Sequence, residues 1–338
     1  MTPTAVICGI GACLPQRSVS NQELAHRLHI PAETIHDLTG IRRRRIAEPG
    51  TSTGDLAVLA GQAALTSAAT ASDFLLLATS TPDRPIPATA PEVAHRLNLG
   101  DIPALDVGAG CPGFLYALTL ARALITSGIC SRPLVIGADV MSSVLDPLDP
   151  TTSMVFGDGA GAVLLGQGPS TQPGAICATD LGSDGSGSDL ITILAGGSRH
   201  PLRDGQPLPP AQHCLREQGP EAFTHAVTRM TASSRHVLDR AGWPTRSVHA
   251  FLGQQANTHL LTTVADHLGI TAPSCFGNIA DVGNTSAASL PLAIADTAAR
   301  QAVPPGTRTL LTTFGAGLTW GSAALTWPDT KPLLVESG

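Results

Sequence analysis

The residues that point most directly to chemistry surround Cys111, in the run LDVGAGCPGFLY at residues 105–116. A strand is expected to run into a helix here, because Pro112 suits the first helical position, where a missing N–H costs nothing. Cys111 would then cap the helix, where unpaired N–H groups and the helix dipole lower a cysteine pKa. Such a thiolate can attack an acyl carbonyl. The alternative is a buried cysteine that serves as a small apolar side chain.

Composition narrows the class of protein around this cysteine. The chain has 338 residues, of which 43% are hydrophobic and 14% charged, so one or two well-packed globular units are expected. No apolar run reaches the roughly 18 residues that cross a bilayer, and no signal peptide is apparent, which predicts a soluble cytoplasmic protein. The net charge of -6 argues against nucleic-acid binding. Seven cysteines without a CxxC pair indicate neither a disulfide framework nor a metal site.

Strand-like and helix-like segments alternate along the chain, which predicts an α/β fold with buried strands. The expected strands are 5–10, 74–81, 104–107, 134–138, 160–165, 175–178, 250–253, 308–313 and 322–327. The expected helices are 53–68, 91–97, 114–127, 220–241, 258–268 and 285–302.

Two glycine-rich turns suggest an internal repeat. Gly157 opens the run GDGAGAVLL and Gly315 opens the run GAGLTWGSAAL, 158 residues further on. Each run leads into an apolar strand and follows a similar one, so two repeated α/β halves are inferred, at 1–170 and 171–338. Chance similarity between glycine-rich turns is the alternative. Neither run has the spacing of a nucleotide-binding loop.

Four motifs together resemble the ketoacyl-ACP synthase III branch of the thiolase superfamily. They are the Cys111 turn, VFGDGAG at 155–161, GNTSAAS at 283–289 and FGAGLTWGS at 314–322, and the run GIRRRRIA at 40–47 agrees with them. The match spans nearly the whole chain in order. The resemblance implies a thiolase fold, that is a duplicated five-layer αβαβα sandwich, in a homodimer with a buried site reached by a pantetheine tunnel.

The family uses a Cys, His and Asn set, and two of its members carry over. Cys111 matches the acylated nucleophile, and Asn284 matches the asparagine that hydrogen-bonds the thioester carbonyl. Where the family has His-Gln-Ala-Asn, this chain has Gln254 in the histidine position, 30 residues before Asn284 as the family spacing requires. The resemblance also places the oxyanion hole at the backbone N–H groups of Cys111 and Gly317.

The replacement of histidine by Gln254 changes the expected chemistry. A glutamine N–H can still donate to a developing enolate oxygen, but the amide neither titrates near neutral pH nor accepts a proton as a base. Loading an acyl group onto Cys111 needs mainly a thiolate and an oxyanion hole. Acyl transfer without carbon–carbon bond formation is therefore favoured over condensation. A base for an alcohol acceptor would have to come from elsewhere, and His200 and His259 are the candidates, each more simply read as a solvated histidine.

Further positions concern the acyl donor. Thr34 and Leu38 stand where coenzyme A-dependent members carry a tryptophan and an arginine, so an acyl carrier protein is the expected donor. Such carriers are acidic, and the four arginines at 42–45 could form a basic patch for one, or else a solvated strand with internal ion pairs. Ile86 and Pro87 match the dimer-interface loop that closes the acyl pocket in the family. The carrier supplies the phosphopantetheine arm, and no other cofactor is expected.

Three hypotheses follow from these residues. The first is an acyltransferase that moves an acyl group from a carrier through Cys111 to a second carrier or small-molecule acceptor, in secondary metabolism of the polyketide or antibiotic type. The second is a decarboxylative condensing enzyme that primes a polyketide or fatty acyl chain, with Gln254 as an oxyanion donor. The third is an inactive carrier-binding subunit, against which the retention of Cys111 and Asn284 argues.

Overall fold

Two β-sheets and three layers of helices form the molecule. The computed structural model describes residues 4–202 and 209–338. The larger sheet has six strands, in the spatial order β14 (Leu333–Ser337), β1 (Thr4–Pro15), β7 (Gly159–Gly168), β6 (Pro133–Asp139), β4 (Phe74–Ala78) and β5 (Ala104–Val107). The smaller sheet has the order β11 (Ala250–Gly253), β12 (Arg308–Gly315), β13 (Thr319–Thr326) and β8 (Ile176–Ser183).

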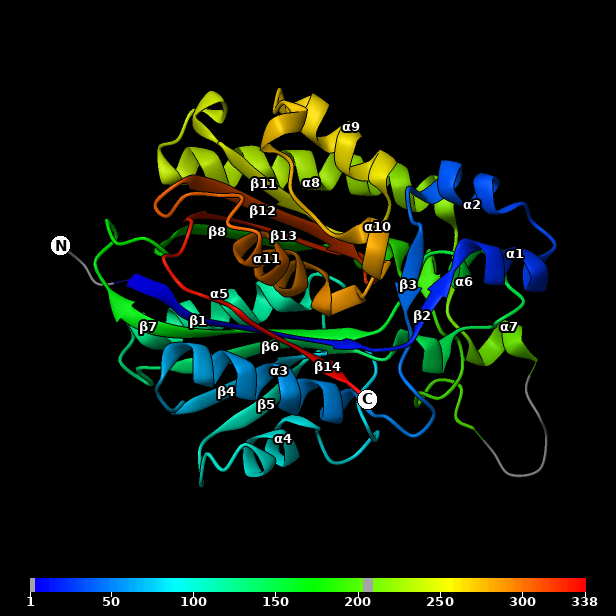
Figure 1. Cartoon of the computed structure of the whole chain (residues 1–338), viewed down its shortest axis with the longest axis horizontal. Helices are drawn as coiled ribbons and strands as arrows, with labels where there is room; N and C mark the ends of the chain where they lie inside the picture. Colours follow the sequence, from blue (N-terminus) through cyan, green and yellow to red (C-terminus); the bar gives the residue numbers. More distant parts are fainter. Residues whose placement is uncertain (1–3, 203–208) are drawn as a thin grey trace.

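Helices fill the space between the sheets and cover both outer faces (Figure 1). The middle layer holds α5 (Gly113–Thr126) and α11 (Ser289–Ala299). The larger sheet is covered by α3 (Thr53–Ala68) and α4 (Ala90–Arg96), and the smaller one by α8 (Gly219–Ala241) and α9 (Thr258–Leu268). This confirms the expected five-layer αβαβα arrangement. The helices 53–68 and 258–268 and the strands 104–107 and 250–253 have the predicted bounds.

The remaining elements of the described chain are two short ribbons, five short helices and several 3₁₀ turns, which lie beside these layers. Two small antiparallel ribbons pair β2 (Ser18–Ser20) with β3 (Arg43–Arg45), and β9 (Ile191–Thr192) with β10 (Arg216–Glu217). The short helices are α1 (Asn21–Leu28), α2 (Ala32–Thr39), α6 (Pro150–Ser153), α7 (Pro210–His213) and α10 (Ile279–Val282). Single 3₁₀ turns occur at 141–144, 185–187, 245–247, 272–274 and 286–288.

The middle helices are apolar on most sides because a sheet packs on each of their two faces. In α5 the side chains of Phe114, Leu118 and Ala121 are fully buried, and they share one core with Leu290 and Ala293 of α11. That core also takes side chains from strands of both sheets. The two sheets therefore hold the start of α5, and the cysteine before it, at a fixed place.

The two sheets share one strand pattern, which agrees with the internal repeat that the glycine-rich turns suggested. In the larger sheet β4 and β6 are parallel and β7 runs antiparallel to β6; in the smaller sheet β11 and β12 are parallel and β13 runs antiparallel to β12. The helix that precedes the second strand of each pair lies in the middle layer. The boundary near residue 170 stays a prediction, since β14 returns from the end of the chain to the larger sheet. Across residues 4–202 and 209–338 no helix is long and apolar enough to cross a membrane.

Candidate active site

Cys111 lies in the turn that joins β5 to α5. Helix α5 begins at Gly113 with Pro112 as its N-cap, so Cys111 precedes the cap by one residue. The prediction that Cys111 is the N-cap was wrong by this one position, because the turn closes first: Gly113 N donates to Gly110 O at 2.9 Å, and Tyr116 N then donates to Pro112 O at 3.1 Å. Gly110 makes the turn possible with a φ of +56°.

A cavity of about 510 Å³ brings Cys111 together with Gln254 and Asn284. The three residues come from the β5–α5 turn, the loop after β11 and the loop after α10. Cys111 is half-buried and reaches this cavity, so the sulfur is not sealed inside an apolar core. Most of the wall is apolar, and its larger side chains are those of Val155, Phe156, Ile191, Phe223, Leu260 and Phe314.

The ionisation of the Cys111 thiol differs from the prediction. Burial raises the pKa of Cys111 to about 12; a hydrogen bond from Ser286 lowers it, and the charges of Asp139 and Glu217 raise it. The prediction of a lowered pKa in the free protein was therefore wrong. The physical reason is that the described lining of the cavity holds no Lys, Arg or His to favour a thiolate, and burial outweighs the dipole of a helix that starts two residues later.

Asp139, at the end of β6, is fully buried, and both of its carboxyl oxygens accept hydrogen bonds. It accepts hydrogen bonds from Ser80 N at 2.7 Å, from Ala287 N at 2.9 Å, and from both N–H and O–H of Thr81 at 3.1 and 3.0 Å. Burial raises the pKa of this carboxyl, and these hydrogen bonds oppose the rise. Asp139 thus ties the turn of Ser286 and Ala287 to the larger sheet, because Oδ2 accepts from Ala287 N while Oδ1 accepts from the segment 79–81.

The hydrogen-bond network around Asn284 fixes which way two side-chain amides point. Ser286 N can only donate, and it lies 3.0 Å from Asn284 Oδ1, so that atom is the oxygen. Gln254 must then present its nitrogen to the same oxygen, at 3.1 Å, and this nitrogen also contacts Ser289 Oγ at 3.2 Å.

This assignment determines what each amide can offer a substrate. Both hydrogens of Gln254 Nε2 are used inside the protein, and Gln254 Oε1 is a buried acceptor without a partner among the described residues. Asn284 Nδ2 donates to no described acceptor and is left for a ligand. Asn284 therefore keeps the donor that the resemblance assigned to it, whereas the expected donor role of Gln254 is at odds with this geometry.

Backbone contacts hold Asn284 in place. Asn284 N donates to Val155 O at 2.9 Å, and Gly157 N donates to Asn284 O at 2.9 Å, which joins two of the family-like motifs. Gly283 precedes Asn284 with φ of 76° and ψ of -170°, a region open essentially to glycine alone. A Cβ there would lie 2.9 Å from Arg44 Cβ and 3.0 Å from Val155 O. Glycine is thus required both by conformation and by space.

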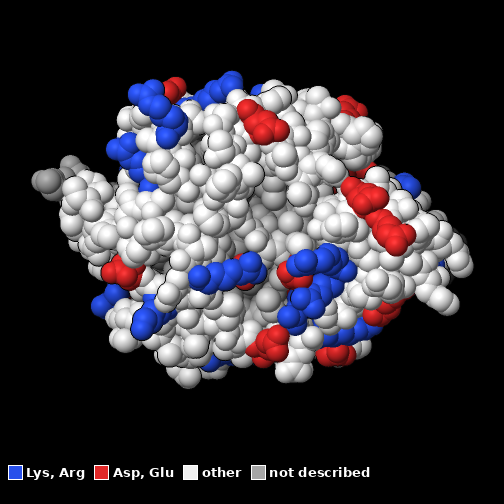
Figure 2. Space-filling model, turned by 45° about the horizontal axis from the view of Figure 1, so that its top comes forward, with Lys and Arg blue, Asp and Glu red and all other residues white. Residues whose placement is uncertain are grey.

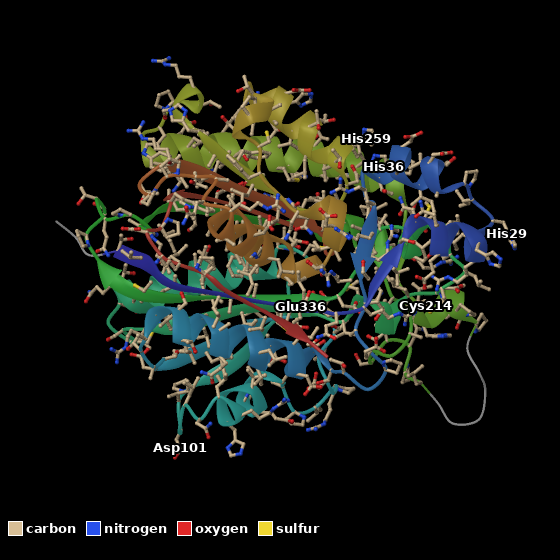
Figure 3. The ribbon with its side chains drawn as sticks, viewed as in Figure 1. His29, His36, Asp101, Cys214, His259 and Glu336 are labelled. Carbon is tan, nitrogen blue, oxygen red and sulfur yellow. The ribbon has the colours of Figure 1, made fainter. Side chains whose placement is uncertain are left out.

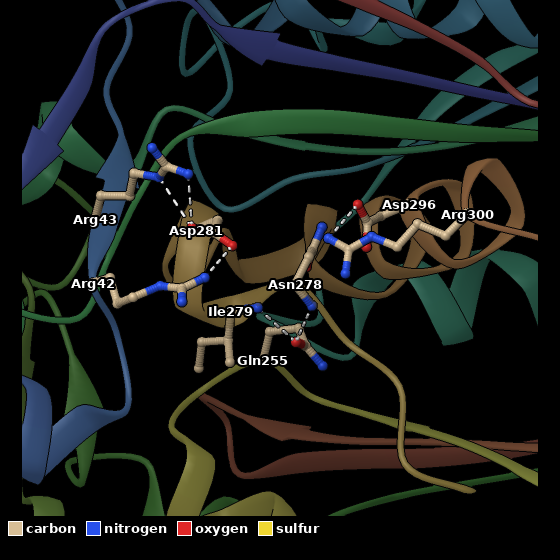
Figure 4. A network of polar contacts seen from close by, with 8 residues as sticks. All are labelled: Arg42, Arg43, Gln255, Asn278, Ile279, Asp281, Asp296 and Arg300. Atoms are coloured by element: carbon tan, nitrogen blue, oxygen red, sulfur yellow. Dashed lines mark hydrogen bonds and ion pairs between the residues drawn. The ribbon is translucent and has the colours of Figure 1, made fainter. Parts of the chain in front are cut away.

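Gln255 has a positioning role beside Gln254 (Figure 4). Gln255 Oε1 accepts from Asn278 N at 3.0 Å and from Ile279 N at 3.1 Å, and Gln255 Nε2 donates to Gly253 O at 2.7 Å. The loop after β11 is therefore bound to the start of α10. Helix α10 leads the chain on toward Asn284, so the contacts of Gln255 help to set the distance between the side-chain amides of Gln254 and Asn284.

The glycine-rich turn after β12 approaches Cys111 through Gly315. A Cβ on Gly315 would lie 2.9 Å from Cys111 N and 3.0 Å from Cys111 Cβ, and Gly315 lines the cavity. Gly317 does not line it, and a Cβ there would meet Thr319 rather than Cys111. The structure thus places Gly315 rather than Gly317 against the nucleophile, and Gly317 as an oxyanion donor stays a prediction.

Neither candidate histidine reaches the cavity. Figure 3 shows His259 on α9 beside α2, where its Nε2 lies 2.8 Å from Asp37 O, and its side chain is exposed. His200 is exposed in the loop before α7 and does not line the cavity. The interpretation of both as solvated histidines fits this placement, and neither is within reach of Cys111.

The arginine run is divided between the surface and the interior. Arg42 and Arg43 are exposed and share Asp281, at 2.8 and 3.0 Å (Figure 4). Arg44 is 1% exposed and donates to Val19 O and Met154 O, while Arg45 pairs with Glu336. Figure 2 shows basic groups interspersed with acidic ones over the face it presents. The alternative of a strand with internal ion pairs therefore describes the run better than a continuous basic patch.

The other predicted positions lie at the rim of the cavity or away from it. Leu38 is 57% exposed and lines the cavity, and Thr34 is exposed on the same helix, α2. Ile86 is 86% exposed, and neither it nor Pro87 lines the cavity within one chain. That this loop closes the pocket of a partner subunit stays a prediction.

Sequence reasoning missed Glu217, which lines the same cavity as Cys111. Burial raises the pKa of this carboxyl, and no ion pair or side-chain hydrogen bond is found for it in the described structure. It stands in the two-residue strand β10, which carries no periodic pattern. The one available signal was an acidic residue just before the glycine and proline that open α8.

With this geometry in view, comparisons with known proteins assign the class. Residues 105–185 match the profile of 3-oxoacyl-[acyl-carrier-protein (ACP)] synthase III, and residues 238–327 match the profile of its C-terminal part. The chain is 51% identical over 330 residues to "Beta-ketoacyl-[acyl-carrier-protein] synthase III 2" of Streptomyces coelicolor, which covers 97% of this chain and 96% of that protein.

Solved structures agree with the sequence matches. The synthase III of Pseudomonas aeruginosa has a TM-score of 0.90 and 43% identity, over 97% of this chain and 100% of that one. The priming β-ketosynthase of the R1128 polyketide pathway has a TM-score of 0.88 and 32% identity, over 96% of each chain. The chain belongs to the ketoacyl-ACP synthase III family of the thiolase superfamily, as its motifs indicated.

Proposed function

We propose that this protein is a decarboxylative condensing enzyme of the ketoacyl-ACP synthase III type, which primes a polyketide or fatty acyl chain from carrier-bound substrates. This was the alternative to transfer without condensation. The observation that carries it is the shared cavity of Cys111 and Asn284, in a chain 51% identical over almost its full length to a relative named as a β-ketoacyl synthase.

The first half-reaction loads Cys111. The sulfur attacks the carbonyl of a carrier-bound thioester, the bond to the pantetheine sulfur breaks, and the thiol proton passes to the departing pantetheine thiolate. No other described residue accepts a hydrogen bond from the backbone N–H of Cys111, and this supports its use as the donor that stabilises the oxyanion. Since the thiol pKa is high, Cys111 gives up its proton only as attack proceeds.

The second half-reaction forms the new carbon–carbon bond. A malonyl thioester loses carbon dioxide, and the electron pair of the broken bond moves into an enolate whose oxygen accepts from Asn284 Nδ2. The enolate carbon attacks the acyl group on Cys111, and the Cys111 thiolate leaves and takes up a proton. One ketoacyl thioester and one carbon dioxide result. The carrier provides the pantetheine arm, and the enzyme contributes no cofactor of its own.

Transfer to a second carrier or small acceptor without condensation remains the second candidate. Two features favour it: the N–H groups of Gln254 are used inside the protein, and the described lining of the cavity holds no cationic side chain to bind a malonyl carboxylate. In that case the acyl group on Cys111 would pass to a hydroxyl, amine or thiol. An origin in antibiotic or other secondary metabolism belongs to the same proposal.

The expected assembly is a cytoplasmic homodimer that meets an acyl carrier protein. Strand β5 is an edge of the larger sheet, and its Leu105 is an exposed apolar side chain; Ile86 in the loop after β4 and Leu120 on α5 are exposed as well. An unprotected apolar edge favours pairing with a second copy. The exposed Arg42 and Arg43 offer a small contact for an acidic carrier, with Asp281 between them.

The decisive experiment separates condensation from transfer. The protein is first loaded with an acyl carrier, and then receives either malonyl carrier labelled in its free carboxyl or a panel of hydroxyl, amine and thiol acceptors. Condensation predicts labelled carbon dioxide in equal amount to the ketoacyl product, and loss of both in Cys111→Ala. Transfer of the acyl group without carbon dioxide release would support the second candidate, and no acylation by any donor would support an inactive subunit. Gln254→His serves as the comparison, with faster condensation expected.

A further inference from the structure

Glu217 is the unexplained group in the cavity. Among the described residues that line this space only Cys111 and Glu217 ionise, and the rest are apolar, amide or small residues apart from Thr151, whose hydroxyl donates to Asp149. The described lining holds no arginine, lysine or histidine to neutralise the carboxyl, and no described side chain forms an ion pair or hydrogen bond with it. The Glu217 side chain is only partly exposed, so a ligand that fills the cavity would shield its carboxyl from water and would have to offer it a hydrogen-bond donor.

The backbone holds Glu217 firmly at this place. In β10, Glu217 pairs with Ile191 of β9, whose side chain also lines the cavity. On either side, Leu215 N donates to Val144 O at 2.8 Å and Gln218 N donates to Leu190 O at 2.8 Å. The strand is therefore anchored at both ends, and the carboxyl faces the cavity as part of a fixed wall.

A second unpartnered acceptor lines the same cavity. Because Asn284 Oδ1 receives the Ser286 N–H, Gln254 turns its nitrogen inward and leaves Oε1 without a donor. A titrating histidine in that position could donate or accept, whereas this arrangement of Gln254 can only accept. Glu217 and Gln254 thus both require hydrogen-bond donors, while the remaining wall offers apolar contact.

We propose that Glu217 is the specificity-determining residue of this cavity and that, together with Oε1 of Gln254 in the same cavity, it binds a hydroxyl or amino substituent of the acyl group or acceptor brought to Cys111. A plain hydrocarbon chain leaves both acceptors unsatisfied, and an anionic chain offers neither of them a donor. A hydroxyl satisfies one acceptor by a hydrogen bond, and an ammonium group adds a charge-assisted one. This inference rests on the proposed use of Cys111 as the acylated residue.

Binding in a protein that cannot turn over tests this inference apart from the proposed function. In the full-length Cys111→Ala protein, calorimetry compares the pantetheine thioesters of butyric, 3-hydroxybutyric and 3-aminobutyric acid. The hydroxy and amino forms are expected to bind about tenfold or more tightly than the butyryl form. Adding Glu217→Leu should reduce both preferences to near one, and Glu217→Gln should keep the hydroxyl preference while losing most of the amino preference. Glu221→Gln, an exposed acid on α8, is the matched control.

Each other result overturns the inference. Equal binding of the three thioesters, or preferences that survive Glu217→Leu, would show that Glu217 does not select the substituent. An equal loss of affinity for all three thioesters in Glu217→Leu would mean that the carboxyl binds the amide groups of the pantetheine arm instead. If Glu217→Leu does not fold, the change in the amino-to-hydroxyl ratio in Glu217→Gln decides. Selective binding without acylation of the wild-type protein would refute the proposed function alone.

Discussion

At the scale of single residues, the sulfur of Cys111 is reachable from the cavity, but its thiol has a high pKa. Burial raises the pKa of its thiol to about 12, and the nearby carboxyls of Asp139 and Glu217 raise it further. The thiolate fraction of such a group is small at neutral pH and rises tenfold with each pH unit below the pKa. We therefore expect the Cys111 thiol to be activated in the complex with substrate and not in the free protein.

Alkylation of the free protein checks this pKa. The rate of iodoacetamide addition to Cys111, followed by peptide mass, should rise about tenfold per unit from about pH 6 to about pH 9 without levelling. In urea the same cysteine should level off above about pH 8.5, its ordinary pKa. A plateau near neutral pH in the folded protein would contradict the assignment and restore the helix-capped thiolate.

At the scale of elements, glycine conformation controls the placement of Asn284. Gly283→Ala should lower the free energy of unfolding by about 3 kcal/mol or more, because its backbone suits glycine alone and its Cβ would meet Arg44 and Val155. Gly128→Ala is the matched control, with φ of 73° and open space, and should cost about 1 kcal/mol. Urea unfolding measures both variants. Equal costs would mean that the close packing at Gly283 contributes nothing.

Replacing the buried Arg44 should destabilise the protein more than replacing its exposed neighbour Arg43. Arg44→Ala removes donors from Val19 O and Met154 O and should destabilise the protein by about 3 kcal/mol. Arg43→Ala breaks only an exposed ion pair with Asp281 and should cost less than about 1 kcal/mol. The comparison uses the same unfolding assay. A larger loss in Arg43→Ala would show that the surface pair, not the interior arginine, stabilises β3.

The sequence predicted most helices and strands of the five layers well, because hydrophobic periodicity and apolar runs indicate which residues are buried. Helix α3, helix α9 and strand β11 have their predicted bounds, since Ser52, Asn257 and flanking turn residues mark their ends. Sequence reasoning missed β10 and β14, whose places depend on distant strands, and also α1 and α2, although Ser20 and Glu23 mark the start of α1 and Gly40 the end of α2.

For the site, residue types predicted the partners but not their orientations. Cys111, Gln254 and Asn284 do meet in one cavity, yet the amide of Gln254 points its donors inward because of Ser286 and Ser289, which no local pattern announces. The thiol pKa was predicted with the wrong sign because burial by distant segments outweighs the local helix dipole. Glu217 was missed for the same reason, since only the folded chain brings it to Cys111.

At the scale of the whole molecule, the exposed edge of the larger sheet should form a dimer. Leu105→Arg places a charge on β5, where Leu105 is 40% exposed, and should convert a dimer to monomers in sedimentation velocity. Leu59→Arg, on the outer helix α3 with 38% exposure, is the matched control and should leave the dimer intact. A monomeric wild-type protein, or dissociation by the Leu59 variant alone, would contradict this assignment.

The most direct test of the account asks whether the acyl group is carried on Cys111. The protein is incubated with an acyl carrier, quenched in acid, digested and mapped by mass spectrometry. We expect the acyl mass on the peptide that contains Cys111, lost on addition of the second substrate and absent from Cys111→Ala. Product formed by Cys111→Ala at the wild-type rate, or an acyl group found only on another residue, would contradict the account.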